Sequence, residues 1–225
     1  MVKRLQRKRP AEYAIIGLGR FGASLARALM ESGNHVLGVD IDGQLVQRVS
    51  DELTHAAILD ATDEEALREV DITSFETVIV AIGADFESNL LTTVALKNLG
   101  ISTVISKVVT RRQREILLRV GADRVVQPEH DAGIRLAEEL MAPKVLERVH
   151  LGPDFSVVEV ETPGSLTSQT LAQLDLRQRM GVTVLVIKRG DDLFVSPPAD
   201  TILLRGDLLL VLGDNETLQV FSNLP

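Results

Sequence analysis

The sequence contains the stretch Tyr13-Ala-Ile-Ile-Gly-Leu-Gly-Arg-Phe-Gly22, in which Gly17, Gly19 and Gly22 form the pattern G-x-G-x-x-G. The apolar run before the first glycine is typical of a β-strand, and the amphipathic residues after the second are typical of a helix. A second apolar run ends at Asp40, 21 residues after Gly19. Glycines between a strand and a helix, followed by an acidic residue about 20 positions later, predict a dinucleotide-binding βαβ unit.

Each residue of this pattern has a physical role. Gly17 permits a tight turn, Gly19 lets a phosphate approach the backbone, and Gly22 lets the helix pack closely on the strand. The free N–H groups at the start of the helix attract phosphate. Asp40 is expected to accept hydrogen bonds from ribose hydroxyls, and its charge disfavours the 2′-phosphate of NADP. The alternative is that the glycines merely form a tight turn.

Strand-like and helix-like segments alternate through the first two thirds of the chain. This alternation predicts a doubly wound parallel sheet of the Rossmann type, in the order 3-2-1-4-5-6. After residue 152 the pattern becomes that of a small α+β module. The six strands are expected at residues 13–16, 35–39, 56–59, 77–82, 103–107 and 124–127.

These patterns predict four parts of the chain. A basic tail covers residues 1–12, and a Rossmann-like domain covers residues 13–130. Helices over residues 131–152, kinked at Pro143, are followed by an α+β domain over residues 153–225.

Residues after the other strands are candidate ligand contacts, because the carboxyl ends of parallel strands share one edge. Asp60 is placed to read the adenine amino group, or to serve as a helix cap or surface carboxylate. The small residues of Ile82-Gly83-Ala84 leave space for a ligand. Lys107 is placed to reach a phosphate, although a surface lysine would look the same.

Two charged residues bear on the kind of phosphate. Arg20 lies within the glycine turn, where a guanidinium favours the terminal polyphosphate of ATP or ADP, in preference to the alternative of an exposed arginine on the first helical turn. Glu129 would repel a phosphate unless a divalent cation bridged them. From spacing alone, an acidic residue that favours the N-terminus of the next helix is the simpler interpretation of Glu129.

Composition excludes several classes of function. The 225 residues include no cysteine, which excludes disulfides, thiolate metal sites and cysteine nucleophiles. Residues 1–10 carry five bases and no acids, and the remaining 215 residues have a net charge of −13. An acidic body argues against nucleic acid as a partner. The tail suits an anionic membrane face or an acidic partner, or is simply solvated.

Membrane spans and secretory signals are not expected either. The apolar runs are far shorter than the ~20 residues that span a bilayer, and the start of the chain lacks the apolar region of a signal peptide. The expected location is the cytoplasm.

Acid–base chemistry has few candidates in this sequence. The four histidines, His35, His55, His130 and His150, are scattered, and Tyr13 is the one tyrosine. A hydride-transfer enzyme needs a proton donor or acceptor beside its cofactor. We therefore expect nucleotide binding without catalysis. An NAD-dependent oxidoreductase of unknown substrate is the first alternative, and a redox-sensing transcription factor, for which a basic recognition helix is missing, is the second.

Several stretches together resemble the KtrA/TrkA family, the cytosolic RCK-domain regulatory subunits of bacterial potassium transporters. The similarity covers about residues 11–222, and its single copy of the unit favours KtrA over the duplicated TrkA. It is carried by Ala14-Ile-Ile-Gly-Leu-Gly-Arg-Phe-Gly22, Val39-Asp-Ile-Asp42, Val78-Ile-Val-Ala-Ile-Gly-Ala84, Gly121-Ala-Asp-Arg124 and Gln127-Pro-Glu129.

The resemblance implies a sensor rather than an enzyme. It implies dimers that assemble into an octameric ring on a membrane-embedded potassium-translocating subunit, at the inner face of the cell membrane. In this family ATP activates, ADP favours an inactive ring, and NAD(H) can occupy the same site. The apolar residues around Pro143 would belong to a crossover helix that swaps between subunits.

The resemblance also implies residue roles. Arg20 would contact the terminal phosphate, and Glu129 would help to hold a divalent cation such as Mg²⁺ or Ca²⁺. The C-terminal half resembles a domain that binds cyclic di-AMP in some members, with Arg177 pairing with a phosphate. The full set of expected nucleotide contacts is Gly17, Gly19, Arg20, Phe21, Gly22, Asp40, Ile41, Asp60, Ala61, Ile82, Gly83, Ala84, Lys107 and Glu129.

Overall fold

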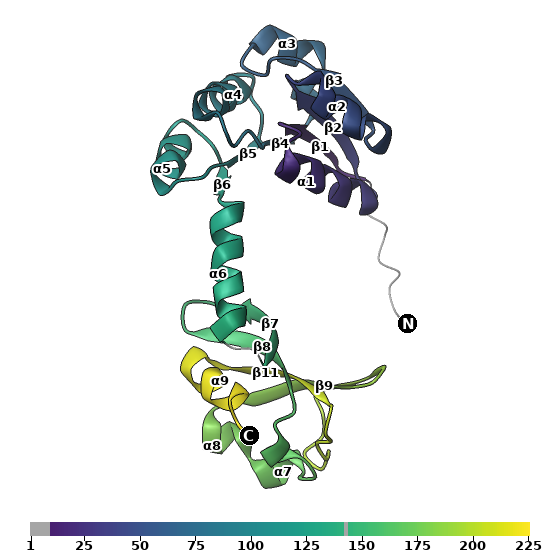
Figure 1. The fold of residues 1–225 in the computed structure, drawn as a ribbon, viewed down its shortest axis with the longest axis vertical. Coiled ribbons are helices and arrows are strands. Elements are labelled where there is room, and N and C mark those ends of the chain that lie inside the picture. Colours follow the sequence, from purple (N-terminus) through teal and green to yellow (C-terminus); the bar gives the residue numbers. More distant parts are fainter. Residues whose placement is uncertain (1–9, 142–143) are drawn as a thin grey trace. The chain divides into compact units, whose positions relative to one another are not determined.

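A computed structural model describes residues 10–141 and 144–225 of the chain (Figure 1). The chain divides into two compact units, Met1–Asp131 and Ala132–Pro225. Most of the predicted basic tail and the predicted kink at Pro143 lie outside the described residues.

The first unit is built on a six-stranded parallel sheet in the order β3-β2-β1-β4-β5-β6. This confirms the predicted order, in which β1 lies between β2 and β4, and the chain changes direction across the sheet there. In the register, Ala14 lies opposite Leu37 on one side and Val78 on the other. The strands are β1 (Glu12–Ile16), β2 (His35–Asp40), β3 (His55–Ile58), β4 (Thr77–Val80), β5 (Thr103–Lys107) and β6 (Arg124–Val126).

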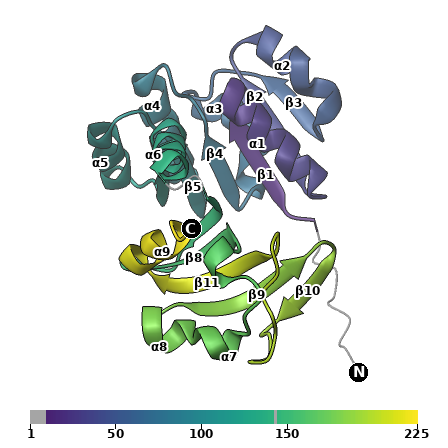
Figure 2. The ribbon, with the colours of Figure 1, turned by 60° about the horizontal axis from the view of Figure 1, so that its bottom comes forward.

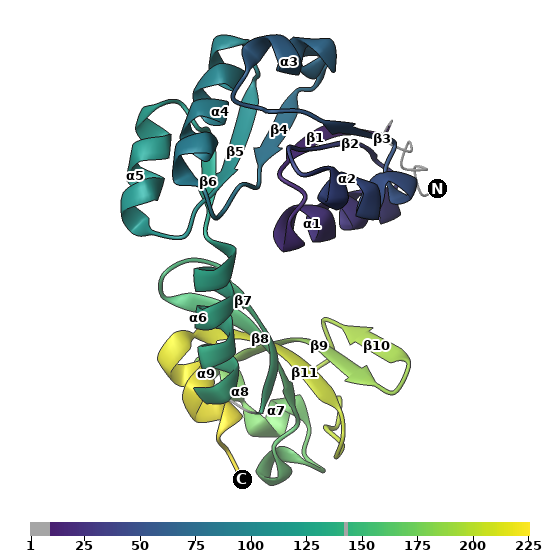
Figure 3. The same cartoon turned by 45° about the horizontal axis from the view of Figure 1, so that its top comes forward.

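Helices cover both faces of this sheet (Figure 3). Ile15 and Ile79 belong to the apolar cluster beneath α1 and α2, whereas Ile16 and Val80 belong to the cluster beneath α3 and α4. Strands buried on both faces need continuous apolar runs, which explains the composition of β1 and β4. The helices are α1 (Arg20–Glu31), α2 (Gly43–Val49), α3 (Glu64–Glu69), α4 (Phe86–Asn98) and α5 (Arg111–Arg119), with 3₁₀ turns η1 (Ser50–Glu52) and η2 (Ile72–Ser74).

The second unit is a five-stranded antiparallel sheet in the order β10-β9-β11-β8-β7 (Figure 2). Alternate residues of β8 and β11 are buried, and they pack with α7, α8 and α9 in one apolar cluster. The predicted small α+β module is therefore confirmed. Its elements are β7 (Val145–His150), β8 (Phe155–Glu161), η3 (Gly164–Leu166), α7 (Leu171–Leu174), α8 (Leu176–Met180), β9 (Thr183–Arg189), β10 (Asp192–Val195), β11 (Leu208–Asp214) and α9 (Asn215–Ser222).

The expectation of helices throughout residues 131–152 is wrong in its second half. Helix α6 covers Pro128–Met141, but Val145–His150 form strand β7, which pairs antiparallel with β8. Two valines in this segment, Val145 and Val149, favour an extended backbone because they are β-branched. Pairing with β8 satisfies backbone groups on one side of β7, which is an edge strand, and Val145 packs against the cluster of the second unit.

An ion pair with a buried carboxylate ties strand β9 to the turn before β11 in the second unit. The Asp207 carboxylate is 1% exposed and accepts from Arg189 Nε and Nη2 at 2.8 and 2.7 Å. The Leu204 N–H also donates to this carboxylate, at 2.9 Å. The hydrogen bonds from Arg189 hold the pKa of Asp207 below its usual value. The carboxylate is therefore stabilised in its charged form by folding.

Asp207→Ala should destabilise the second unit by about 1–3 kcal/mol, because the Leu204 N–H and the partly exposed Arg189 guanidinium lose a charged hydrogen-bond acceptor. The exchange rates of β8 and β11 amides in deuterated water measure this loss. Since the folded pKa is lowered, the stabilisation is present above about pH 4 and is lost as the pH falls through the folded pKa. The variant and the wild type should therefore converge in acid.

Glu52→Ala is the matched control, because it breaks the exposed ion pair of Glu52 with Arg27 in the first unit. Exposed pairs contribute little to stability. Equal exchange of the β8 and β11 amides in the wild type and in Asp207→Ala at neutral pH would contradict the account.

Candidate nucleotide-binding site

The turn after β1 requires glycine at its first position. Gly17 has a φ of +96°, which L-residues with side chains rarely adopt. Its N–H donates to the Val39 carbonyl at 2.7 Å, so the turn is attached to β2. A Cβ on Gly17 would lie 3.0 Å from backbone atoms of Ala81 and Ile82. The turn therefore sits directly against the end of β4.

The other two glycines have different roles. A Cβ on Gly22 would lie 1.8 Å from the Gly17 carbonyl oxygen, so α1 packs onto the turn with no room for a side chain. Gly19 is the N-cap of α1, and a Cβ there would meet no atom within 4 Å. The first turn of α1 has no acidic residue. The N-terminus of the helix thus faces open space with its positive dipole end, an arrangement that suits an anion.

Asp40 is engaged with the backbone of this turn. Its Oδ2 accepts from the Leu18 N–H at 2.6 Å, and its Oδ1 accepts from the Asp42 N–H at 2.9 Å. The carboxylate thus fixes the glycine turn to the end of β2, in addition to the ribose contact predicted for it. The neighbouring Ile41 side chain is 69% exposed and offers an apolar surface beside this carboxylate.

Asp60 and Ala61 follow β3 at the same edge of the sheet. Asp60 Oδ1 accepts from the N–H and the hydroxyl of Thr62, at 2.9 and 2.7 Å. Asp60 is exposed, whereas Ala61 is buried in the core. The Asp60 carboxylate therefore stabilises its own turn with one oxygen, and a contact to adenine stays a prediction.

Charged side chains from β5 and α6 meet beside the glycine turn. Lys107 Nζ donates to Glu129 Oε1 at 2.7 Å and lies 5.5 Å from the centre of the Phe21 ring. The Lys107 side chain is 12% exposed, against 64% for Glu129. A Cβ on Gly83 would lie 3.1 Å from Lys107 Nζ, so this glycine makes room for the amine.

The pKa of Glu129 reports on this arrangement. It is lowered chiefly by the hydrogen bond from Lys107, and also by the nearby charges of Lys107 and Arg20. Two cations and one carboxylate therefore lie at the edge of the sheet where the phosphate is expected. The net positive charge suits a phosphate, and guanidinium pairs well with its oxygens.

Asn89 of α4 is not among the site residues predicted from the sequence. Its Nδ2 donates to the Ile82 carbonyl at 2.6 Å and to the Lys107 carbonyl at 2.8 Å. Both acceptors belong to residues predicted to line the site. The available signal was a cluster of polar residues, Asn89, Thr92 and Thr93, on a helix face that packs against the sheet.

The metal role predicted for Glu129 remains a prediction. Among residues 10–141 and 144–225, no group of three or more histidines, aspartates or glutamates is placed to hold a metal ion. The Glu129 carboxylate is instead paired with Lys107.

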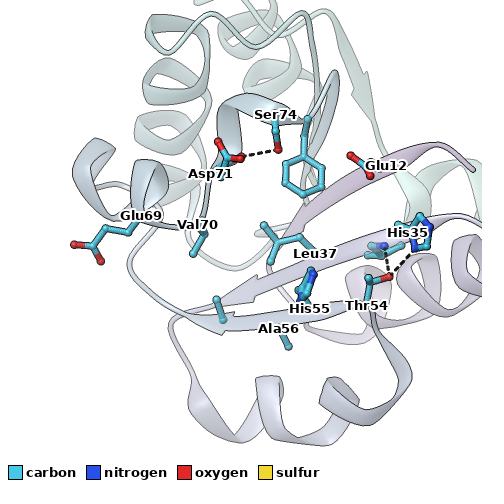
Figure 4. A pocket seen from close by; sticks show the side chains of 13 residues that line it. Glu12, His35, Leu37, Thr54, His55, Ala56, Glu69, Val70, Asp71 and Ser74 are labelled. Carbon is cyan, nitrogen blue, oxygen red and sulfur yellow. Dashed lines mark hydrogen bonds between the residues drawn. The ribbon is translucent and has the colours of Figure 1, made fainter.

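A pocket of about 660 Å³ lies at the opposite, amino edge of the sheet (Figure 4). Its walls combine apolar residues such as Leu37 and Phe75 with Glu12, His35 and His55 at the starts of three strands. It contains none of the predicted nucleotide contacts. The glycine turn lies at the carboxyl edge, so this pocket is separate from the candidate site.

Comparison with known families agrees with both units. The TrkA-N domain family matches residues 13–128, and the TrkA-C domain family matches residues 156–225. The chain belongs to the KtrA/TrkA family. In the described part of this family member, no helix is long and apolar enough to cross a membrane.

Two potassium uptake proteins resemble the chain over most of its length, and one solved domain resembles its N-terminal part. Ktr system potassium uptake protein C of Bacillus subtilis is 39% identical over 202 residues, covering 90% of this chain and 91% of that protein. Ktr system potassium uptake protein A of the same organism is 37% identical, covering 94% and 96%. The NAD(P)-binding domain of an exopolyphosphatase-related protein from Archaeoglobus fulgidus is 29% identical, with a TM-score of 0.52 over 58% of this chain and 97% of that domain.

Gly22→Ala and Gly19→Ala should separate the role of the turn in folding from its role in nucleotide binding. Gly22→Ala forces a clash with the Gly17 carbonyl and should lower stability by about 1–3 kcal/mol or more, seen as a lower melting temperature. Gly19→Ala meets open space at an ordinary φ of −63°, so its melting temperature without ligand should match the wild type. Its new methyl group should weaken nucleotide binding. Equal melting temperatures for both variants would contradict the geometry of the turn.

Proposed function

We propose that this chain is the nucleotide-sensing regulatory subunit of a potassium uptake system. ATP, ADP or NAD(H) binds at the carboxyl edge of the parallel sheet, and the identity of the nucleotide sets the arrangement of a homo-oligomeric ring that gates a membrane transporter. The observation that carries the proposal is the open N-terminus of α1 at Gly19, flanked by Arg20 and by the Lys107–Glu129 pair.

The ligand is inferred from charge and shape. The glycine turn leaves room for a phosphate against the backbone, and Asp40 at the end of β2 disfavours the 2′-phosphate of NADP. Arg20 adds positive charge where a terminal phosphate would lie. NAD(H) is supported as a second ligand by the similarity of this domain to the NAD(P)-binding domain from Archaeoglobus fulgidus.

Sensing requires that two nucleotides stabilise different states. A ligand shifts a conformational equilibrium only by its difference in affinity for the two states. ATP and ADP differ by one phosphate, so the groups that distinguish them must contact that phosphate. Arg20 is the residue proposed for this contact, and a divalent cation held near Glu129 would add to it.

The transport role and the oligomer are supported by separate features. The Ktr relatives of Bacillus subtilis are potassium uptake proteins by name. Ile134, Leu140 and Met141 on α6 are 49–73% exposed, which is costly for large apolar side chains unless another chain covers them. We propose that α6 packs on a second copy, that the assembly is an octameric ring, and that it lies at the inner face of the membrane on its transporter.

Arg20→Ala should reduce the preference for ATP over ADP by about tenfold, since a charge-assisted hydrogen bond is worth about 1.5–3 kcal/mol. The adenosine part of both ligands should bind as before. Calorimetric titration of the full chain with each nucleotide measures the ratio of dissociation constants. An oxidoreductase would instead oxidise bound NADH with a small carbonyl compound. Such turnover would contradict the proposed sensor function.

Arg27→Ala is the matched control. Arg27 lies on the same helix and pairs with Glu52, away from the glycine turn. Its loss removes the same charge from α1 and should leave the ratio unchanged. If Arg20→Ala weakened ATP and ADP by the same factor, Arg20 would not be the residue that senses the terminal phosphate.

A further inference from the structure

Asn89 joins the ends of two neighbouring strands through a single side chain. The residue is 1% exposed and lies near the start of α4. Its amide nitrogen donates to the Ile82 carbonyl just after β4 and to the Lys107 carbonyl at the end of β5, at 2.6 and 2.8 Å. A side-chain amide has two N–H donors, so both are used. The opposite orientation of the amide would point its oxygen at two carbonyl oxygens and is excluded.

A buried polar chain lies behind Asn89, whose orientation is set by the two short bonds to the carbonyls. Thr93 Oγ1 donates to Asn89 Oδ1 at 3.4 Å and lies 2.9 Å from Ser106 Oγ. Thr93 and Ser106 are fully buried. A network of this kind is strongly constrained, because each unpaired polar group in a core is costly.

The two carbonyls that Asn89 holds belong to the two sides of the candidate phosphate site. Ile82 leads into Gly83 and Ala84, while Lys107 carries the amine that contacts Glu129 and Phe21. The Lys107 amine lies over Gly83. A change in the distance between the Ile82 and Lys107 backbones would therefore move the amine relative to the glycine turn.

We propose that Asn89 is a positioning residue for the nucleotide site. By donating hydrogen bonds to the Ile82 and Lys107 carbonyls, it holds the Lys107 amine where a ligand phosphate can replace Glu129 as its hydrogen-bond partner. This inference rests on the proposed function. It extends that function to a buried residue that touches no ligand and that acts through the backbones of β4 and β5.

The test compares a nucleotide with its phosphate-free core. In Asn89→Ala the Lys107 amine loses its fixed position, so the dissociation constant for ADP should rise roughly tenfold, the effect of weakening one charged hydrogen bond. The dissociation constant for adenosine should not change. Asn89→Ser, which is too short to reach both carbonyls, is the second variant and replaces the first if Asn89→Ala does not fold.

Thr93→Val is the matched control. It removes a hydroxyl of the same buried network at nearly constant volume and leaves both bonds from Asn89 to the carbonyls in place. It should lower the melting temperature while ADP and adenosine bind as in the wild type. This result would separate positioning from general destabilisation of α4.

The remaining outcomes are decisive. If the Asn89 variants bind ADP as the wild type does, or if their dissociation constants for ADP and adenosine rise by the same factor, Asn89 is only structural and the inference is wrong. If the wild-type chain itself binds neither compound, the proposed function fails first, and the inference fails with it.

Discussion

The close contact between α1 and the turn after β1 is the constraint on which the first unit depends. Because a Cβ on Gly22 would lie 1.8 Å from the Gly17 oxygen, only glycine lets the helix start directly against the sheet edge. This contact places the N–H groups at the start of α1 at the carboxyl end of β1, between β2 and β4. The helix N-terminus is therefore already in place for the anion of the proposed site.

The charges around this helix end are balanced rather than uniformly positive. Arg20 and Lys107 favour phosphate, whereas Glu129 occupies Lys107 and opposes an anion. In the proposed site, a ligand phosphate would therefore compete with the Glu129 carboxylate for Lys107. The gain from displacing Glu129 would grow with the negative charge of the ligand, in addition to the attraction from Arg20. Under the proposed function, a difference in affinity of this kind is what would shift the assembly between two states.

Local sequence patterns were enough for much of the fold. The strand order follows from the alternation of apolar runs and helices, and the positive φ of Gly17 follows from the glycine spacing. Strand β7 was mistaken for a helix because Val145–His150 lacks a strict apolar–polar alternation, and it becomes extended by pairing with β8, the next strand along the chain. Asn89 was missed because sequence does not reveal which polar residue of a helix faces a carbonyl. The contacts to nucleotide remain predictions from the motif and the resemblance.

The central claim is that the terminal phosphate of a bound nucleotide changes the arrangement of the assembled chains. Small-angle X-ray scattering of the full chain, with saturating ATP and then with saturating ADP, tests it most directly. The account predicts two different scattering profiles from the same number of subunits. Superimposable profiles, with both nucleotides shown to be bound, would contradict it.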